Sequence, residues 1–298
     1  MNSSPVSVLW DTTSAAAFIA VPSASDTKYS RGVLGVATGS KRYPGAAVLS
    51  VEAAHRTGIG MVRYSGPRSV AGLVLSRRPE VVTTSGRVQA WLVGSGMDAR
   101  SRTHKEQVRL QRAFASGCPL VVDAGALDLV ASARGPVVIT PHARELATLL
   151  LAKGTPSAQA FTGVDELASV IAAQPERWSQ TAADELAVTV LLKGNVTHVA
   201  TPNFAAPLDG HSTRFHAHIA SPTTWLATAG TGDVLAGILG ALVATHSEQV
   251  LASPAVLGPL AATAALLHGL AAERASHGGP IAALDVAEAL PLAIAGIL

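Results

Sequence analysis

Charged and aromatic residues are scarce in this chain of 298 residues, and each shortage excludes a class of protein. Asp, Glu, Lys and Arg together make up 14% of the residues and aromatic residues 4%, whereas 48% are hydrophobic. A disordered chain needs the opposite balance, so we expect a sizeable packed core. The formal net charge is only +2. No run of Lys and Arg is long enough to follow a nucleic-acid backbone, and the pair Arg77-Arg78 is interpreted as part of a solvated loop.

The chain has one cysteine, Cys118, and one cysteine cannot form an internal disulfide. This fits a reducing compartment. No basic N-terminal segment is followed by an apolar run, so no secretory signal is expected. Between Glu248 and Glu273 the chain lacks Asp, Glu, Lys and Arg, but prolines and a glycine interrupt it. Buried helices are favoured over a membrane span. We therefore expect a cytoplasmic protein that binds no membrane.

Short apolar runs alternate with helix-like stretches from residue 31 to about residue 200. Near-continuous apolar strands indicate a sheet covered on both faces, and their alternation with helices indicates a parallel sheet in a three-layer sandwich. The sequence shows no linker and no internal repeat. We expect one domain over 28–298, nearly all helical from Thr231 onward, after a loosely structured N-terminal lead over 1–27. Strands are predicted at 32–37, 61–64, 81–82, 90–93, 120–122, 137–139 and 187–192, and helices at 46–56, 101–116, 144–151 and 164–173.

The strongest motif is the glycine-rich turn Ala229-Gly230-Thr231-Gly232-Asp233, which an apolar helix follows. The unpaired N–H groups of such a turn, together with the positive end of a helix, suit a phosphate. Asp233 could simply cap the helix. It could also be a general base that takes a proton from a hydroxyl attacking a phosphoryl group. The spacing fits neither a Walker A loop nor a dinucleotide fingerprint.

Four further segments follow predicted strands, where the ligand loops of α/β sheets lie. Taken alone, each has an ordinary structural interpretation as well: a turn before a helix, a polar contact, or a hairpin. His142 is favoured as a substrate contact over an acid–base catalyst. The segments are Ser40-Lys41-Arg42-Tyr43-Pro44-Gly45-Ala46-Ala47, Val93-Gly94-Ser95-Gly96, Thr140-Pro141-His142-Ala143-Arg144-Glu145 and Leu192-Lys193-Gly194-Asn195-Val196-Thr197.

In this order, and with Val122-Asp123-Ala124, these segments resemble the ADP/ATP-dependent NAD(P)H-hydrate dehydratases of the ribokinase-like superfamily. The resemblance covers nearly the whole chain from about residue 28. It implies a ribokinase-like α/β/α sandwich with a mainly parallel sheet. It also implies dehydration of the S-epimer of hydrated NADH or NADPH (NADHX or NADPHX). In that reaction the terminal phosphoryl group of ADP, the expected nucleotide, or of ATP activates the hydroxyl of the hydrate. Elimination then gives NAD(P)H, phosphate and AMP or ADP.

The resemblance also assigns roles to residues. Asp233 is the expected base, and the N–H groups of Gly230, Thr231 and Gly232 form an anion hole. Mg²⁺ is expected to bridge the nucleotide phosphates, with protein ligands that the sequence does not identify. The protein is expected to form a homo-oligomer. It is also expected to work with a separate NAD(P)HX epimerase, since no room remains for a fused epimerase domain. The hydrate-binding positions are Ala46, Gly96, His142 and Asp233, and the nucleotide-binding positions are Lys193, Gly194, Asn195, Val196, Thr197 and Gly232.

The chain departs from the family pattern in its proposed hydrate pocket. Ser95 stands between Gly94 and Gly96 in place of the usual proline, and Gly125 replaces a frequent aspartate. Ala143-Arg144 replaces Pro-Gly, and the arginine adds bulk and charge beside a proposed substrate loop. Two alternatives stay open: a vitamin-precursor kinase of the same fold, because fold and anion hole alone do not fix the acceptor, and a nucleotide-binding protein without turnover.

Overall fold

The computed structural model describes residues 7–203 and 214–298. A nine-stranded sheet of order β1-β9-β8-β7-β6-β5-β4-β2-β3 runs through its centre. Only β8 runs antiparallel to its neighbours in this sheet. The prediction of a mainly parallel sheet is thus confirmed. The strands are β1 (Val8–Leu9), β2 (Val33–Ala37), β3 (Met61–Tyr64), β4 (Ala90–Val93), β5 (Leu120–Val122), β6 (Val137–Ile139), β7 (Thr189–Leu192), β8 (Val196–Ala200) and β9 (His216–Ala220).

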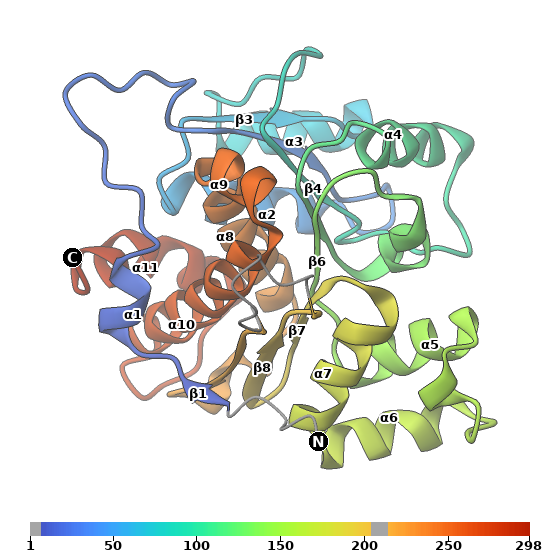
Figure 1. The fold of residues 1–298 in the computed structure, drawn as a ribbon. Helices are drawn as coiled ribbons and strands as arrows, with labels where there is room; N and C mark the ends of the chain where they lie inside the picture. Colours follow the sequence, from blue (N-terminus) through green and yellow to red (C-terminus); the bar gives the residue numbers. More distant parts are fainter. Residues whose placement is uncertain (1–6, 204–213) are drawn as a thin grey trace.

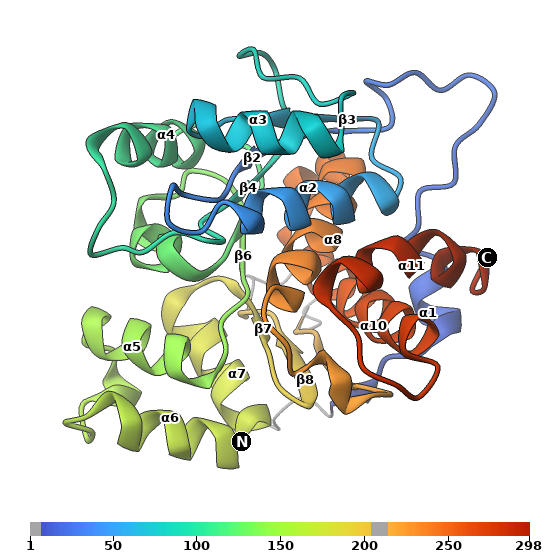
Figure 2. The same cartoon turned by 180° about the vertical axis from the view of Figure 1, so that it is seen from behind.

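Helices cover both faces of the sheet, as the near-continuous apolar strands predict (Figures 1 and 2). Helices α1, α2, α3, α8, α10 and α11 pack on one face, and α4, α5, α6 and α7 pack on the other. The helices are α1 (Thr12–Ala16), α2 (Gly45–Arg56), α3 (Arg68–Arg77), α4 (His104–Phe114), α5 (Ala143–Lys153), α6 (Val164–Ala173), α7 (Pro175–Leu186), α8 (Thr231–Thr245), α9 (Ser247–Ala252), α10 (Leu257–Ser276) and α11 (Ala283–Ala295), with 3-10 turns η1 (Ala124–Ser132), η2 (Pro156–Ala158), η3 (Thr224–Leu226) and η4 (Pro254–Val256).

Side chains of one strand alternate between the two cores. Val121 of β5 points into the core under α8 and α10, while Leu120 and Val122 point into the core under α4 and α5. Both sets are fully buried. A strand that is apolar at every position is the physical consequence of two covered faces.

The expectation of a loosely structured lead is wrong for residues 7–16. β1 pairs with β9 and forms one edge of the sheet, and α1 follows it, capped by the Asp11 side chain. Trp10 is buried, and its Nε1 donates to Thr263 Oγ1 of α10 at 3.2 Å. A two-residue strand has too little periodicity to be visible in the sequence.

Helix α10 belongs to the apolar stretch that was interpreted as core, and the structure confirms that interpretation. Residues 254–276 are long and apolar enough to cross a membrane, but 72% of the most apolar window is buried inside the protein. The helix lies against α8 and α11 and under β8 and β9. Alanine and glycine on these helices allow the close approach that the composition predicts.

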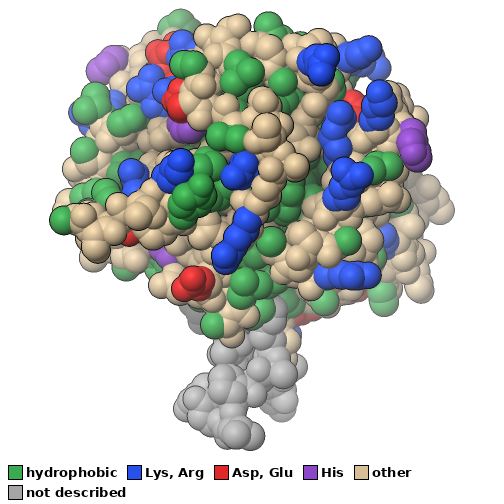
Figure 3. Space-filling view, turned by 90° about the horizontal axis from the view of Figure 1, so that it is seen from above, with side chains coloured by type: hydrophobic (Ala, Val, Ile, Leu, Met, Phe, Trp, Pro, Cys, Tyr) green, Lys and Arg blue, Asp and Glu red, His purple; other side chains and the backbone are tan. Residues whose placement is uncertain are grey.

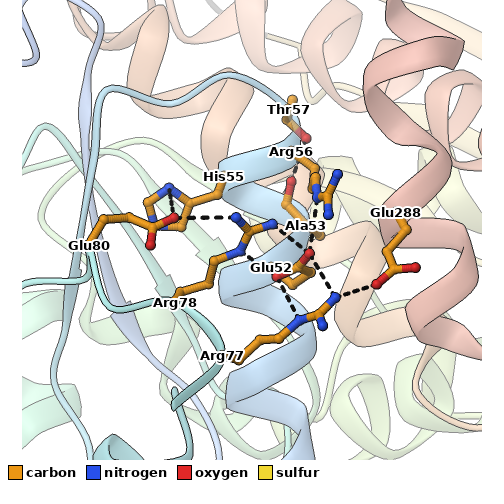
Figure 4. A network of polar contacts seen from close by, with 9 residues as sticks. All are labelled: Glu52, Ala53, His55, Arg56, Thr57, Arg77, Arg78, Glu80 and Glu288. Atoms are coloured by element: carbon orange, nitrogen blue, oxygen red, sulfur yellow. Dashed lines mark hydrogen bonds and ion pairs between the residues drawn. The ribbon is translucent and has the colours of Figure 1, made fainter. Parts of the chain in front are cut away.

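The interpretation of Arg77-Arg78 as a solvated loop is wrong. Arg77 ends α3 and Arg78 caps it, and both guanidinium groups bind the carboxylate of Glu52 on α2, which is fully buried (Figure 4). Arg56, one turn along α2, binds the same carboxylate at 3.0 Å. A buried carboxylate needs such partners, and it explains why two adjacent arginines stand here.

The remaining differences concern short strands. Val81-Val82, predicted as a strand, forms only an isolated bridge between Val82 and Arg63 of β3. Strands β8 and β9 were not predicted. The segment Lys193-Gly194-Asn195 makes a hairpin turn between β7 and β8. Its structural interpretation is therefore correct, but the turn lies at the edge where ligand loops gather.

Candidate active site

The predicted ligand segments meet at one edge of the sheet. Strands β2, β4, β5, β6 and β7 are parallel, so their carboxyl ends point the same way. The loops and helices that follow these ends carry four of the segments singled out in the sequence, and the glycine-rich turn comes after β9, which runs in the same direction as β7. Ligands of open α/β sheets bind at this edge.

Asp123 is the buried centre of the polar residues at this edge. It follows β5 and is only 3% exposed. Ser95 Oγ donates to its Oδ2 at 2.8 Å, and Thr140 Oγ1 donates to its Oδ1 at 2.8 Å. The ammonium group of Lys193 lies 3.1 Å from Oδ1. Three donors from three neighbouring strand ends therefore fix one carboxylate.

Lys193 connects this carboxylate to the loop of His142. Its Nζ lies 3.5 Å from the carboxylate of Glu145, and its backbone N–H donates to Pro141 O at 2.8 Å. Burial works against the charge of Lys193, but the charges of Asp123 and Glu145 outweigh it and raise its pKa. Lys193 is thus a fixed cation at the edge of the sheet.

His142 and Glu145 cap the first turn of α5. The backbone N–H of His142 donates to the Glu145 carboxylate at 2.9 Å, and the Glu145 N–H donates to His142 Nδ1 at 3.3 Å. His142 Nε2 lies 3.6 Å from Glu145 Oε2, and the imidazole is about half exposed, so a ligand can still reach it. The geometry fits a substrate contact better than an acid–base catalyst.

The glycine-rich turn begins α8. Gly230 is its N-cap at φ +92°, a left-handed conformation that favours glycine. Thr231 Oγ1 lies 2.9 Å from the carbonyls of Leu226 and Thr228, so the hydroxyl closes the turn rather than facing a ligand. The first N–H groups of a helix have no partner within it. A turn of this kind at the start of α8 is compatible with the anion hole that the sequence predicts, which stays a prediction.

Asp233 lies in the first turn of α8. Burial raises its pKa, and the negative charge of Asp123 raises it further, while Lys193 acts in the opposite direction. The net result is a pKa of about 7. A carboxyl group with that pKa can hold and release a proton near neutral pH, which is what a general base requires.

The proposed hydrate positions Ala46 and Gly96 lie against each other. Gly96 has φ +67°, and a Cβ there would clash with the Ala46 side chain. Ala46 lies in the first turn of α2, and the Leu49 side chain of the same helix lies 2.6 Å from where a Cβ of Gly230 would stand. The small residues bring the loop after β4, the start of α2 and the glycine turn together.

A pocket of about 610 Å³ opens beside this cluster. That volume lies within the range of small-molecule sites. Of the proposed nucleotide positions, Lys193, Gly194, Asn195, Thr197 and Gly232 line the pocket, and Val196 does not. His142, one of the proposed hydrate positions, and Thr231 of the glycine-rich turn line it as well. The remaining walls come from β9, η3 with its flanking residues, α8 and α10, elements that no sequence motif connects. They are Ile219, Ser221, Thr223, Thr224, Leu226, Ala227, Leu235, Ala265, His268 and Gly269.

His268 of α10 is a pocket residue that sequence reasoning missed. It is 8% exposed, and its Nε2 has no hydrogen-bond partner among the described residues. Burial lowers its pKa to about 4, although a hydrogen bond to the Thr231 backbone acts in the opposite direction. The ring is therefore neutral at pH 7. The only sequence signal is a single histidine in a long apolar helix, which is usually a core residue.

The departures from the family pattern have structural explanations. Ser95 is fully buried and supplies one of the donors to Asp123. A side chain at Gly125 would clash with Met97 O, so an aspartate has no room there. Arg144 is 63% exposed and forms an ion pair with Asp165, so it points out of the cluster rather than into it.

No group of three or more His, Cys, Asp or Glu side chains within residues 7–203 and 214–298 could hold a metal by itself. Asp123 and Asp233 lie close enough for the charge of one to raise the pKa of the other. Magnesium commonly binds through one or two carboxylates plus the phosphates of a substrate. These two carboxylates are therefore compatible with Mg²⁺ that arrives with a nucleotide.

Comparison with known proteins agrees with this geometry. The chain is 39% identical over 241 residues to the bifunctional NAD(P)H-hydrate repair enzyme Nnr of Mycobacterium leprae, covering 77% of this chain and 44% of that protein. It is 29% identical over 256 residues to the ADP-dependent (S)-NAD(P)H-hydrate dehydratase of Xanthomonas campestris, covering 78% of this chain and 79% of that protein. The chain thus spans about half the length of the bifunctional relatives it matches.

The fold is shared with the ADP/ATP-dependent NAD(P)H-hydrate dehydratase of Bacillus subtilis, which was co-crystallised with ATP/Mg²⁺. The TM-score is 0.77 at 23% identity, covering 99% of this chain and 100% of that one. The predicted ribokinase-like sandwich is confirmed. The sequence model of the NAD(P)H-hydrate dehydratase family matches residues 34–291. The chain belongs to the NAD(P)H-hydrate dehydratase family.

Proposed function

We propose that this protein dehydrates the S-epimer of NADHX or NADPHX to NADH or NADPH and consumes ADP or ATP in doing so. The observation that carries the proposal is the position of Asp233. A carboxyl group with a pKa of about 7 lies in the first turn of α8, close enough to the fixed cation Lys193 to feel its charge, and we propose that the N–H groups of this turn form the anion hole. A base next to a phosphate site is what phosphoryl transfer to a hydroxyl needs.

The chemistry follows from leaving groups. Hydroxide leaves carbon poorly and phosphate leaves well. Asp233 takes the proton of the hydrate's hydroxyl group. At the same time the hydroxyl oxygen forms a bond to the terminal phosphorus of the nucleotide, and the bond between that phosphorus and the bridging oxygen breaks. The N–H groups of Gly230 to Gly232 stabilise the charge on the transferring group. Loss of phosphate from one ring carbon and of a proton from its neighbour then restores the double bond.

The nucleotide is placed in the pocket of Lys193 to Thr197 and Gly232, and the hydrate ring beside Ala46, Gly96 and His142. Lys193 would meet the phosphates, and the polar walls of the pocket would meet the rest of the nucleotide. Mg²⁺ bound with the nucleotide would neutralise part of the phosphate charge, with Asp123 and Asp233 as its nearest carboxylates. The Xanthomonas relative is named ADP-dependent, which supports ADP as the first nucleotide to test.

The direct test is the near-ultraviolet absorbance of the reduced nicotinamide, followed with purified protein, NADHX, Mg²⁺ and either ADP or ATP. We expect a rise that depends on the nucleotide. No rise with either nucleotide, in protein shown to bind them, would sink the proposal. It would redirect attention to the kinase alternative and to a screen of hydroxylated acceptors.

The Asp123 charge gives a further prediction about pH. If Asp233 acts as a base, kcat/KM rises with pH as its carboxyl group loses its proton near pH 7. In Asp123→Asn, the negative charge that raises this pKa is gone. Lys193 also loses Asp123 as its carboxylate partner, so the positive charge of Lys193 acts more strongly on Asp233. Both effects lower the pKa of Asp233, so the acidic limb should move to lower pH.

Ser95→Ala is the matched control, because it removes a hydrogen bond to Asp123 without removing a charge. Its acidic limb should stay close to that of the wild type. An Asp123→Asn limb that stays in place, or moves to higher pH, would contradict the electrostatic account of Asp233. Thermal melting of each variant checks that the proteins are folded.

A homo-oligomer, a separate NAD(P)HX epimerase as working partner and a cytoplasmic location belong to the same proposal. The name of the Mycobacterium relative, a bifunctional repair enzyme, supports a second activity alongside the dehydratase. The most apolar part of α10 is mostly covered by the chain itself, but Leu292 on α11 is 59% exposed and offers an apolar contact. Light scattering on the purified protein would test the oligomer, and a monomer at micromolar concentration would remove it from the proposal.

A further inference from the structure

A second cavity, of about 650 Å³, lies at the same edge of the sheet, beyond the hydrate positions. It is formed by the loop after β2, the start of α3 and the start of α4. Cationic side chains dominate its walls, with one carboxylate, Glu106, among them. Neither the anion hole nor the nucleotide pocket uses them. The five cations are Lys41, Arg42, Arg68, Lys105 and Arg109.

Within the described part of the chain these cations have no close carboxylate partner, although the charge of Arg42 acts on Asp98. Among the described residues, none of the five forms an ion pair with a carboxylate within 4.0 Å. Glu106 is 6% exposed and is held by the backbone and hydroxyl of Thr103 at 2.7 and 2.8 Å, as part of a helix cap. The positive ends of α3 and α4 open toward the same cavity and add to the potential. Figure 3 looks down on the top of the molecule as it is drawn in Figure 1. This face carries many more basic than acidic side chains.

The cavity adjoins the proposed hydrate positions. Ser40, Lys41 and Arg42 line the basic cavity. The carbonyl oxygen of the next residue, Tyr43, lies 2.9 Å from the point where a Cβ of Gly96 would stand. Gly39 N–H donates to Ser95 O at 2.7 Å, which joins the loop after β2 to the loop after β4. A ligand whose reacting ring lies at Gly96 and Ala46 can therefore extend into the basic cavity.

Another route, past His142, is less suited to phosphates. The cavity on that side is lined by Arg144, Lys153, Asp128 and Glu145, so its charges balance. Arg144 is already paired with Asp165, and Lys153 already donates to Asp128 O at 3.1 Å. A ligand portion with several negative charges is better accommodated where five unpaired cations face one capped carboxylate. Arginine, with its planar fork of donors, is the residue best suited to phosphate.

We propose that the basic cavity of Lys41, Arg42, Arg68, Lys105 and Arg109 binds the phosphorylated adenosine half of the hydrate, and that it makes NADPHX the preferred substrate over NADHX. This inference rests on the proposed dehydratase function. The 2′-phosphate adds about −1.5 to −2 charge at neutral pH, the scale known for phosphorylated side chains. The diphosphate bridge is common to both hydrates, so it provides no preference.

Two measurements test the proposal. The first is calorimetric binding of adenosine 2′,5′-bisphosphate, of its 3′,5′ isomer and of AMP to the full chain saturated with a non-hydrolysable ATP analogue and Mg²⁺. The second is the ratio of kcat/KM for NADPHX to that for NADHX. Both are made on the wild type, on the double variant Arg68→Gln/Arg109→Gln, and on Arg112→Gln, which removes an exposed charge from α4 outside the cavity.

We expect the 2′,5′-bisphosphate to bind the wild type most tightly. The double variant should lose about tenfold or more in both its affinity for this probe and its substrate ratio. Arg112→Gln should leave both unchanged, and added salt should reduce the wild-type ratio. An unchanged ratio and affinity in the double variant, or equal binding of the isomer or of AMP to the wild type, would overturn the proposal. Absence of turnover with both hydrates would instead refute the dehydratase function, while the binding series still decides the site.

Discussion

Asp233→Asn is expected to lower kcat by about a thousandfold, within the range that general acid–base catalysis contributes. The amide has nearly the shape of the carboxyl group but cannot take the proton of the attacking hydroxyl. Nucleotide affinity should be kept or slightly tightened, because the variant removes a negative charge next to the phosphates. The measurements are steady-state kinetics with NADHX or NADPHX and calorimetric binding of the nucleotide.

The pH dependence of kcat/KM distinguishes a general base at Asp233 from a residue that only caps the helix. Wild-type kcat/KM should rise with pH through about 7, and the residual activity of the variant should lack that limb. Asp165→Asn is the matched control, because this side chain is 78% exposed and pairs with Arg144 away from the pocket. Normal turnover in Asp233→Asn would remove the base from the mechanism and leave Asp233 as a helix cap.

How far the sequence predicts this fold depends on where the side chains of each element point. Strands such as β4 and β6 are apolar on both faces, and the sequence predicts their bounds correctly because two covered faces leave an unmistakable signal. β8 and β9 contain His198, His216 and His218, which interrupt that signal. β1 is only two residues long, and its position is set by the backbone of β9. Pairing of that kind is tertiary and cannot be read from local pattern.

The site divides in the same way. The glycine turn with Asp233, and the Lys193 loop, are contiguous motifs, and the structure brings them together as the family resemblance implies. His268 was missed because it comes from a distant helix. The basic cavity was missed because Lys41, Arg68 and Arg109 lie on three separate segments. Only the order of β4, β2 and β3 in the sheet puts those segments side by side. The net charge of +2 gave no sign of so local a concentration.

The buried carboxylate of Glu52 is a second place where one substitution should have a large effect. It is fully buried and is bound by Arg56 at 3.0 Å and by Arg77 and Arg78 (Figure 4). Burial by itself would raise its pKa, but the hydrogen bonds from Arg78, Arg56 and Arg77 outweigh it and lower the pKa. The cluster joins the end of α3 to the middle of α2, whose first turn carries Ala46. It therefore supports the helices that frame the proposed hydrate site.

Glu52→Gln is expected to lower the free energy of unfolding by about 3 kcal/mol, because it leaves three guanidinium groups facing an amide. Urea unfolding at neutral pH measures it. Glu80→Gln is the matched control: Glu80 pairs with Arg78 at 3.3 Å but is 47% exposed, so its loss should cost less than about 1 kcal/mol. Since the folded pKa of Glu52 is lowered, its contribution is complete above the unfolded pKa and is lost as pH falls through the folded pKa. The difference between wild type and Glu52→Gln should therefore shrink in acid. Equal stability of the two proteins at neutral pH would mean that the arginines can find other partners, and that the joint between α2 and α3 depends on packing alone.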